Sequence, residues 1–293
     1  MSEAAGRDAR LPAGETPALP GRKILTMRGD DLPSLETLGG DLLDLPVWRK
    51  AISLTVPFAL VLAFFVLAAR GLWIAALACP VILSFITYGS VSHDLVHRTL
   101  RLPRWLNESL LCAIELIAFR SGHAYRFTHL HHHARFPADD DIEARSARMS
   151  FIGALLDGVT LQPRLWFFAM RESVRERRWI VCEGIAVIVL LAAAIAAIPW
   201  TPIPAIYAAL MIGGSWIFPL VTVFIPHLPL GESELTRTRL FRGIVLSILA
   251  AEHLYHLEHH LYPQVPHQYW PRLAKRLDPH FARLGIHPVK LFL

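Results

Sequence analysis

Four apolar segments of 19 to 23 residues constrain the fold of this chain more than any other feature. At 1.5 Å per residue, a helix of that length is roughly 28 to 35 Å long, which matches a hydrocarbon core of about 30 Å. Short turns join the segments in two pairs, so we expect two helical hairpins. With 54% hydrophobic and 18% charged residues, the chain carries more apolar surface than a soluble domain of its length needs. We therefore predict an all-α integral membrane protein with four transmembrane helices, over residues 51–69, 72–92, 180–198 and 203–225.

The rest of the chain is divided into a leader and a cap. Residues 1–45 are rich in Gly, Pro, Ala and charge and lack an apolar signal core, which predicts a disordered leader rather than a cleaved signal peptide. Residues 46–293 are then a single membrane domain. Its helical, histidine-rich cap consists of residues 93–178 and 226–293.

The distribution of positive charge predicts how the chain lies in the membrane. Of the 29 Lys and Arg residues, only Arg70 lies in a hairpin turn. The positive-inside rule therefore predicts that both termini and the cap are cytoplasmic. Within the cap, residues 105–119 and 150–171 are apolar and are expected to lie at the interface. Glu183, near the start of the third span, is expected to extend its carboxylate to the interface.

Nine histidines lie at or just beyond the ends of the apolar runs, and their spacing indicates a metal site. Residues three and four apart share one face of a helix, so HDLVH offers two imidazoles, and HLHHH and HLEHH offer three each. Imidazole is a good ligand for iron, zinc and copper. One four-coordinate zinc ion cannot use so many nitrogens, whereas two metal ions could take four or five each. The candidate ligands are His93, His97, His129, His132, His133, His227, His256, His259 and His260.

Other polar residues near these sets are expected to support the site. Metal-bound imidazoles usually donate their second N–H to a carboxylate or a carbonyl, so at least one neighbouring acid should orient a ligand. His131 lies about 200° around a helix from His129 and should point away from the metals, whereas His253 could face them. We assign neither as a ligand. The neighbouring acids are Asp94, Asp139, Asp140, Asp141, Glu143, Glu252 and Glu258. The histidines expected at the surface or in ordinary hydrogen bonds are His123, His267, His280 and His287.

The three histidine sets, in this order, resemble the membrane fatty acid desaturase superfamily, which also includes carotenoid ring hydroxylases and ketolases. The resemblance covers about residues 50–285, from HxxxH through HxxHH to a second HxxHH that is followed by LYP. It implies four transmembrane helices and a histidine-rich cytoplasmic cap that holds two irons. It also implies that the histidines of the three sets are the catalytic iron ligands, and that His227 stands where the family often has a further ligand. Those eight catalytic candidates are His93, His97, His129, His132, His133, His256, His259 and His260.

The resemblance implies an O₂-dependent oxidoreductase that attacks an unactivated C–H bond of a lipid. The same histidine pattern serves the formation of a double bond, an alcohol or a ketone, so it leaves the product open. The stretch YHLEHHLYP (residues 255–263) suits fatty acyl desaturases, which is our first interpretation. The stretch IPHLP (residues 225–229) is similar to a turn of carotenoid (β-ionone ring) hydroxylases and ketolases, which are the alternative. A divalent-metal transporter is a more distant alternative, because the spans are almost free of His and Asp.

Electrons for such a reaction must come from another protein. The chain has no haem-attachment motif, no four-cysteine cluster motif and no dinucleotide-binding glycine loop. Cys79, Cys112 and Cys182 lie in apolar stretches and are expected to be buried thiols, neither disulfide-bonded nor metal-bound. The basic cap favours an acidic donor, either ferredoxin-like or of the cytochrome type, and nothing predicts a nucleic-acid partner.

Overall fold

The computed structural model describes residues 32–243 and 253–290. Within these residues the only strands are β1 (Phe241–Arg242) and β2 (Val289–Lys290), which form a short parallel pair. The α-helices are α1 (Leu35–Leu38), α2 (Val47–Ala69), α3 (Trp73–Ile86), α4 (Ser92–His97), α5 (Arg104–Ile117), α6 (Gly122–Arg135), α7 (Phe151–Glu172), α8 (Arg177–Ala196), α9 (Ile203–Gly214), α10 (Glu234–Arg237), α12 (His256–Leu261) and α13 (Trp270–Arg283). The 3₁₀ segments are η1 (Gly40–Leu43), η3 (Ala144–Arg148), η4 (Ser215–Ile217), η6 (His253–Tyr255) and η7 (His267–Tyr269), and the π-helical segments are η2 (Thr87–Val91) and η5 (Pro219–Phe224). The predicted all-α fold is confirmed.

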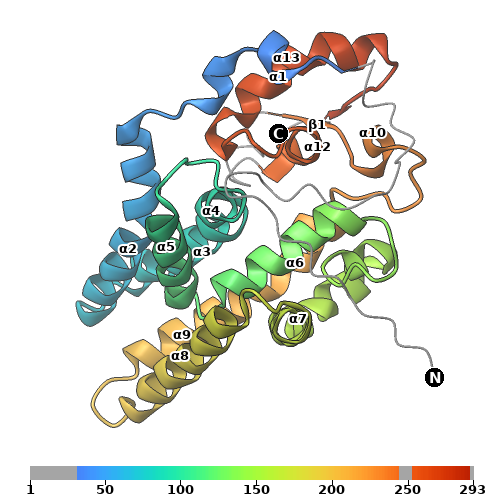
Figure 1. The fold of residues 1–293 in the computed structure, drawn as a ribbon. Helices are drawn as coiled ribbons and strands as arrows, with labels where there is room; N and C mark the ends of the chain where they lie inside the picture. The colour runs from blue at the N-terminus through green and yellow to red at the C-terminus, as the bar shows by residue number, and fades with distance from the viewer. Residues whose placement is uncertain (1–31, 244–252, 291–293) are drawn as a thin grey trace, which may run out of the picture.

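Four helical stretches are long and apolar enough to cross a membrane. They form two hairpins, α2 with α3 and α8 with α9, and α3 packs against α9 so that the hairpins form one bundle (Figure 1). Many of their apolar side chains are exposed, as a lipid-facing surface requires, with Ile74 at 91% and Ile188 at 68%. The four stretches are Gly40–Ala69, Trp73–His97, Arg177–Ala196 and Ile203–Phe224. The four predicted spans are therefore present as span-length helices.

Two of these stretches contain a π-helical segment just before their histidines. The second stretch passes from α3 through η2 into α4, so it continues five residues beyond the predicted end at residue 92 and carries His93 and His97 on its last turns. The fourth passes from α9 through η4 into η5, three residues before His227. A π-helix inserts an extra residue into a helical turn, which changes the direction of the side chains that follow, and such segments are frequent at functional sites.

The cap begins with the two helices that were expected at the interface. The first is α5, and the second is α7, in which the Ser150 side chain accepts a hydrogen bond from the Gly153 amide. Between them, α6 carries the second histidine set, and Ser121 caps its first turn by accepting from the Ala124 amide. Both caps satisfy amide groups that the first helical turn leaves without partners. The order of these helices matches the sequence expectation.

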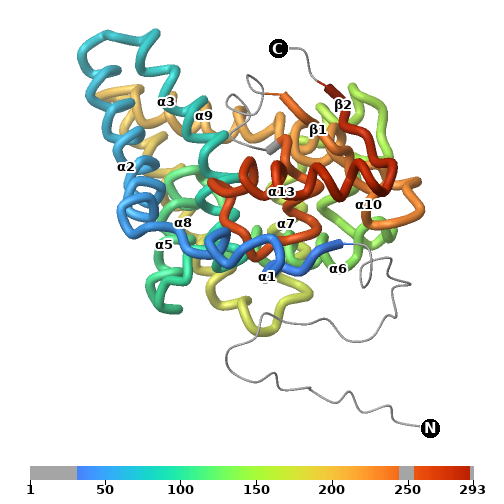
Figure 2. Tube along the Cα trace, turned by 90° about the horizontal axis from the view of Figure 1, so that it is seen from above, coloured from blue at the N-terminus to red at the C-terminus, as the bar shows by residue number. Residues whose placement is uncertain are grey.

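The C-terminal part of the cap lies across the histidine-bearing ends of the bundle. Its last helix, α13, buries Leu273 and Leu277 in the main core and turns its charged residues outward. Figures 1 and 2 both show α1 lying along α13. The histidine-bearing helix α12 packs beneath α13. This layer places the third histidine set against the first two.

The expectation of a disordered leader over residues 1–45 is wrong for its last part. Residues 32–45 form α1 and η1, and Leu38, Leu42 and Leu45 are buried in the core that contains α13. The spacing of these leucines brings them to one side, and burial of their side chains offsets the cost of ordering the segment. Residues 1–31 lie outside the described part of the chain.

The three cysteines are free, as expected, but they are not all buried. Cys79 is buried, Cys112 is half-buried, and Cys182 is exposed. The expectation is wrong for Cys182 because the outer face of α8 has no protein neighbour there, and an apolar sequence context indicates lipid contact as readily as core packing.

Candidate metal centre

The structure brings all nine candidate histidines together in two adjacent groups. They come from α4, α6, α12 and the turn that follows η5, in which His227 lies three residues after Phe224. Within each group, the nitrogen atoms that can bind a metal lie within 4.8 Å of one another. The groups are in contact, since the His133 and His260 rings stack with centroids 4.5 Å apart. The five-histidine group is His93, His97, His129, His133 and His259, and the four-histidine group is His132, His227, His256 and His260.

In the five-histidine group, four Nε2 atoms form a closed ring. The Nε2 atom of His93 lies 3.0 Å from that of His259 and 3.0 Å from that of His129. The Nε2 atom of His133 lies 3.1 Å from that of His129 and 2.8 Å from that of His259. The buried Nε2 atom of His97 has no hydrogen-bond partner among the described residues. Five ligand nitrogens thus surround one small volume.

In the four-histidine group, three Nε2 atoms form a triangle. Those of His256 and His260 lie 3.1 Å apart, and they lie 3.2 and 3.3 Å from that of His227. The fourth nitrogen, Nε2 of His132, lies 3.0 Å from that of His227. The Nε2 atom of His227, which follows the fourth span, is thus close to the Nε2 atoms of all three other histidines of this group.

The hydrogen-bond partners of these rings indicate that a cation fits between them. Nδ1 of His129 lies 3.0 Å from a carboxylate oxygen of Glu143, Nδ1 of His132 lies 2.7 Å from one of Asp141, and Nδ1 of His227 lies 3.0 Å from the Val223 carbonyl oxygen. A neutral imidazole that donates from Nδ1 carries a lone pair on Nε2. These Nε2 lone pairs therefore point toward one another, which is unfavourable unless a cation lies among them.

The nitrogen spacing also matches metal coordination. With metal–nitrogen bonds of about 2.1 Å, two ligands at a right angle are about 3 Å apart. The measured contacts of 2.8 to 3.3 Å fall at this value. The residues present therefore fit two metal ions, one in each group. That the nine histidines are ligands stays a prediction, now with a geometry that supports it.

Burial keeps most of these imidazoles in the form that binds metal. Burial, together with the neighbouring imidazoles, lowers the pKa of several rings well below the usual value, so they are neutral at pH 7. His132 differs: burial alone would lower its pKa, but the Asp141 carboxylate outweighs burial and raises it. The pKa of Asp141 is lowered, because His132 and the Ala144 amide outweigh the effect of its burial. The rings with a lowered pKa outside the spans are His133, His227, His256, His259 and His260.

Of the acids expected near the site, two hold candidate ligands. Asp141 and Glu143 are buried and contact His132 and His129, as described above. Asp94 instead accepts from the ring and the amide of His267. Glu258 is fully buried and pairs with Arg242 at 2.6 Å. Asp139 and Asp140 pair with arginines at the surface, and Glu252 lies outside the described residues.

The remaining histidines lie largely where the sequence places them. The His131 ring points away from both groups, toward the Asp140 carbonyl and Phe168. The side chain of His253 lies outside what the structure describes. His267 is held by Asp94, and His280 and His287 lie at or near the surface.

A buried polar network beside the site was missed at the sequence level. His123 lies between two carboxylates, with Nδ1 2.6 Å from Glu183 and Nε2 3.0 Å from Glu108. The Ser121 hydroxyl donates to Glu183 at 2.6 Å. The expectation that Glu183 reaches the interface is therefore wrong, because its carboxylate turns inward to these donors. A carboxylate within an apolar run is itself a signal of such a partner.

A small cavity lies between the two histidine groups and the spans. Its volume is ≈ 20 Å³, and its lining includes Tyr88, Gly89 and Thr222 from the two π-helical segments. It also touches histidines of both groups. Tyr88 is stacked between Tyr125 and Phe218, with ring centroids 4.3 and 4.4 Å away. Residues of the two π-helical segments thus meet histidines of both groups at this cavity.

A comparison with models of known protein families gives a match. The model of the family described as fatty acid desaturase matches residues 71–291, a range that contains all nine histidines. No curated protein matches the chain.

Proposed function

The chain belongs to the fatty acid desaturase family, and from that premise we propose that it is a membrane oxidoreductase that uses two irons and O₂ to introduce a double bond into a fatty acyl chain. The observation that carries the proposal is the division of the histidines into a five-nitrogen and a four-nitrogen group in contact with each other. All-nitrogen sites of neutral imidazole suit iron among the metals that proteins bind. Two irons held there would supply O₂ activation and the removal of hydrogen from a C–H bond.

The residues of the chain prepare this chemistry in three ways. Asp141 and Glu143 fix the tautomers and ring directions of His132 and His129. The buried rings keep bulk water away from the reacting carbon, which prevents side reactions. The cavity beside Tyr88 is narrow and admits only a group as small as one methylene.

The π-helical segments support a lipid substrate. Gly89 and Thr222 come from the second and fourth spans, so the cavity opens between helices whose outer faces are apolar. An acyl chain that enters from the bilayer side would meet Tyr88, Gly89 and Thr222 before the histidines. We propose this approach for the substrate, because the outer faces of the two spans are apolar and an acyl chain can pass along them without burying a polar group.

We further propose that both termini and the metal centre face the cytoplasm and that a separate protein supplies electrons. All Lys and Arg residues except Arg70 lie outside the hairpin turns, which supports this orientation. The sequence carries no motif for a redox cofactor of its own beyond the histidines. An acidic ferredoxin-like or cytochrome-type donor fits the positive charge of the cap.

One observation favours a second candidate, hydroxylation or ketolation of a carotenoid ring. The IPHLP stretch, which resembles that branch of the superfamily, supplies His227 to the four-histidine group. The metal-transport alternative is weaker, because the histidines gather at the ends of the spans, whereas transporters hold their ions near the midplane.

The experiment is lipid and pigment profiling of host cells that express the chain, with and without carotenoid synthesis. We expect new double bonds in acyl chains, and about two irons per purified chain. His259→Ala should abolish the product, whereas His131→Ala, which alters a histidine of the same cap outside both groups, should retain it. Oxygenated rings with unchanged acyl chains would instead establish the carotenoid reaction. Zinc transport without iron or product would refute both reactions.

A further inference from the structure

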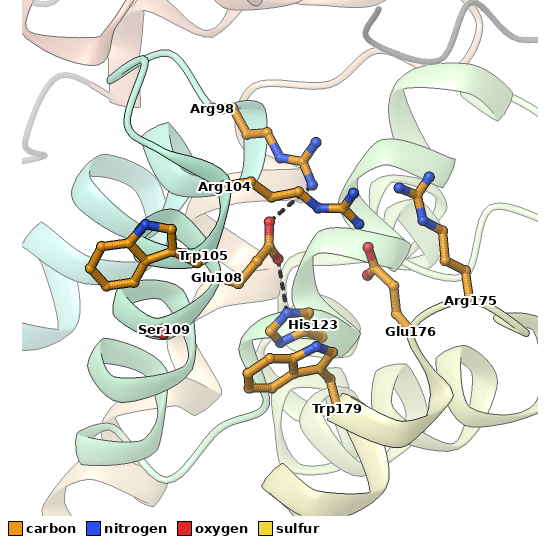
Figure 3. A pocket seen from close by; sticks show the side chains of 9 residues that line it. All are labelled: Arg98, Arg104, Trp105, Glu108, Ser109, His123, Arg175, Glu176 and Trp179. Carbon is orange, nitrogen blue, oxygen red and sulfur yellow. Dashed lines mark hydrogen bonds and ion pairs between the residues drawn. The ribbon is translucent and has the colours of Figure 1, made fainter. Parts of the chain in front are cut away.

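A second and larger pocket lies apart from the histidine groups. Its volume is ≈ 530 Å³, within the range of small-ligand sites. It is bounded by the end of α4, the first turns of α5 and the start of α8 (Figure 3). Three arginines, Arg98, Arg104 and Arg175, surround it, and Figure 3 shows their guanidinium groups pointing toward one another across the opening.

The carboxylates of this pocket are already engaged. Glu108 pairs with Arg98 at 2.9 Å and also contacts Arg126 and His123. Glu176, the other acid, lies 3.7 Å from Arg126. Among the described residues, no carboxylate pairs with Arg104 or Arg175. Two positive charges in excess therefore converge on a concave site.

Such an arrangement favours the binding of an anion. Like charges that converge repel one another, and the repulsion is removed when a negative group binds between them. Guanidinium groups present a planar fork of donors that matches the oxygen atoms of phosphate. A phosphate monoester carries about −1.5 to −2 at pH 7 and would balance these two unpaired arginines, whereas a diester carries one negative charge and would balance one of them. The chemistry of the pocket thus points to a phosphate group.

The position of the pocket relative to the membrane surface identifies the source of that phosphate. Trp105 at the start of α5 is 70% exposed, and Trp179 at the start of α8 is 43% exposed and stacks on the His123 ring at 4.6 Å. Exposed tryptophans at the ends of apolar helices mark the boundary between hydrocarbon and headgroups. Since α8 is a span, its first turn lies at that boundary.

We propose that this pocket binds the phosphate of a membrane lipid headgroup, with Arg104 and Arg175 as the principal contacts. Arg98 would add a third guanidinium while it remains paired with Glu108. The proposal does not depend on the reaction at the histidine groups, because its residues are other than the nine histidines. It assigns a lipid-binding role to residues that the metal centre leaves unexplained.

The test measures lipid binding to the full-length protein, purified in an uncharged sugar detergent. The probes are phosphatidylglycerol, phosphatidate, diacylglycerol as the lipid without phosphate, and inorganic phosphate. Binding is followed by tryptophan fluorescence, to which Trp105 and Trp179 contribute, and the number of bound lipids by native mass spectrometry. We expect both phospholipids to bind and diacylglycerol not to bind. Binding of inorganic phosphate as tight as that of the phospholipids would overturn the assignment to a lipid.

The variants are Arg104→Gln and Arg175→Gln, singly and together, with Arg178→Gln as the matched control. Arg178 is exposed in the first turn of α8, three residues after Arg175, but does not line the pocket. Each pocket variant should weaken phospholipid binding about tenfold or more, the expected loss for a hydrogen bond to a charged group. Because Arg104 and Arg175 are exposed, the unfolding temperature should not fall, which separates lost binding from lost folding. Equal affinity of the double variant and the Arg178→Gln control would refute the proposal.

Discussion

Asp141 shows how one carboxylate can determine the direction of a candidate metal ligand. It accepts from Nδ1 of His132 at 2.7 Å and from the amides of Glu143 and Ala144, so it is held in place by its own turn. Its neighbour Asp140 is exposed and pairs with Arg135 instead. Two adjacent aspartates thus have opposite surroundings, so a substitution at Asp140 is a matched control for the same substitution at Asp141.

Asp141→Asn should weaken iron retention in the four-histidine group. An amide cannot act as a charged acceptor, so His132 loses the partner that fixes its tautomer, and the expected loss of metal affinity is about 10- to 100-fold. Iron per chain is measured after competition with a chelator. Asp140→Asn, the control, should keep the wild-type iron content. Equal retention by the two variants would show that Asp141 does not orient a ligand.

At the scale of elements, close helix packing brings the spans and the cap together. The contact between α7 and η4 allows no side chain at Gly158, where an added Cβ would lie 1.7 Å from the Trp216 carbonyl oxygen. Because the obstacle is backbone, it cannot rotate away. At Gly213 on α9, by contrast, an added Cβ meets nothing within 4 Å.

Gly158→Ala should therefore destabilise the fold, and Gly213→Ala should not. Overpacking of a tight contact costs about 1–3 kcal/mol, whereas alanine in an open helical position is favoured by up to about 1 kcal/mol over glycine. Thermal unfolding in detergent compares the two variants. If Gly158→Ala unfolds at the same temperature as wild type, the contact between α7 and η4 has room for a methyl group and the prediction is wrong.

The network of Glu108, His123 and Glu183 joins α5, α6 and α8, and its titration gives stability a pH dependence. Burial alone would lower the pKa of His123, but the hydrogen bonds with Glu108 and Glu183 outweigh burial and raise it. Burial alone would raise the pKa of Glu108, but His123, Arg126 and Arg98 lower it to about 2. The raised pKa of His123 stabilises the fold fully below the unfolded value of about 6.5, and this contribution is lost as pH rises through the folded pKa. The lowered pKa of Glu108 stabilises it above about 4.5, and that contribution is lost as pH falls toward 2.

His123→Gln should thus lower the unfolding temperature most between about pH 4.5 and 6.5, and less as pH rises above 6.5. The measurement is the difference in unfolding temperature between wild type and variant, followed from about pH 4.5 to pH 9. Taking the difference cancels the titration of the other histidines. A difference that stays constant up to pH 9 would show that protonated His123 does not contribute.

The elements also show which features the sequence could predict. The spans follow from length and hydropathy, and the histidine sets follow from helical spacing, because both are local properties. The π-helical segments at Thr87–Val91 and Pro219–Phe224 have no local signature, since an extra residue in a turn is stabilised by the packing around it. The contact of His123 with Glu183 joins residues 60 apart, which no local pattern encodes.

At the scale of the whole molecule, local sequence patterns also could not predict how the candidate site is divided. Spacing singled out eight of the nine candidate histidines, and the family resemblance added His227, but their division into five and four required the positions of α6 and α12 in space. His132 and His133 are adjacent in sequence yet belong to different groups. Similarly, Leu38 and Leu42 gain their ordered positions from α13, more than 200 residues later, so composition alone indicated disorder.

The net charge of the molecule, +5, leads to the last prediction, which concerns electron entry. Lys275 and Arg283 are exposed on α13. At the start of this helix the buried Trp270 ring lies 5.4 Å from the His93 ring and 5.1 Å from the His259 ring. A donor that binds to α13 would therefore lie on the helix whose buried Trp270 packs against the five-histidine group.

If the proposed acidic donor binds there, reduction of the iron-loaded protein should slow as ionic strength rises, because salt screens the attraction between the charged surfaces. Lys275→Glu should slow reduction by about tenfold at low salt, within the range of electrostatic steering, and the difference from wild type should narrow at high salt. Stopped-flow reduction with a photosynthetic-type ferredoxin measures both effects, and Arg70→Glu, in the turn of the first hairpin, is the control. Rates that are independent of salt, or equal in the two variants, would place electron entry elsewhere on the cap or assign it to a donor that is not acidic.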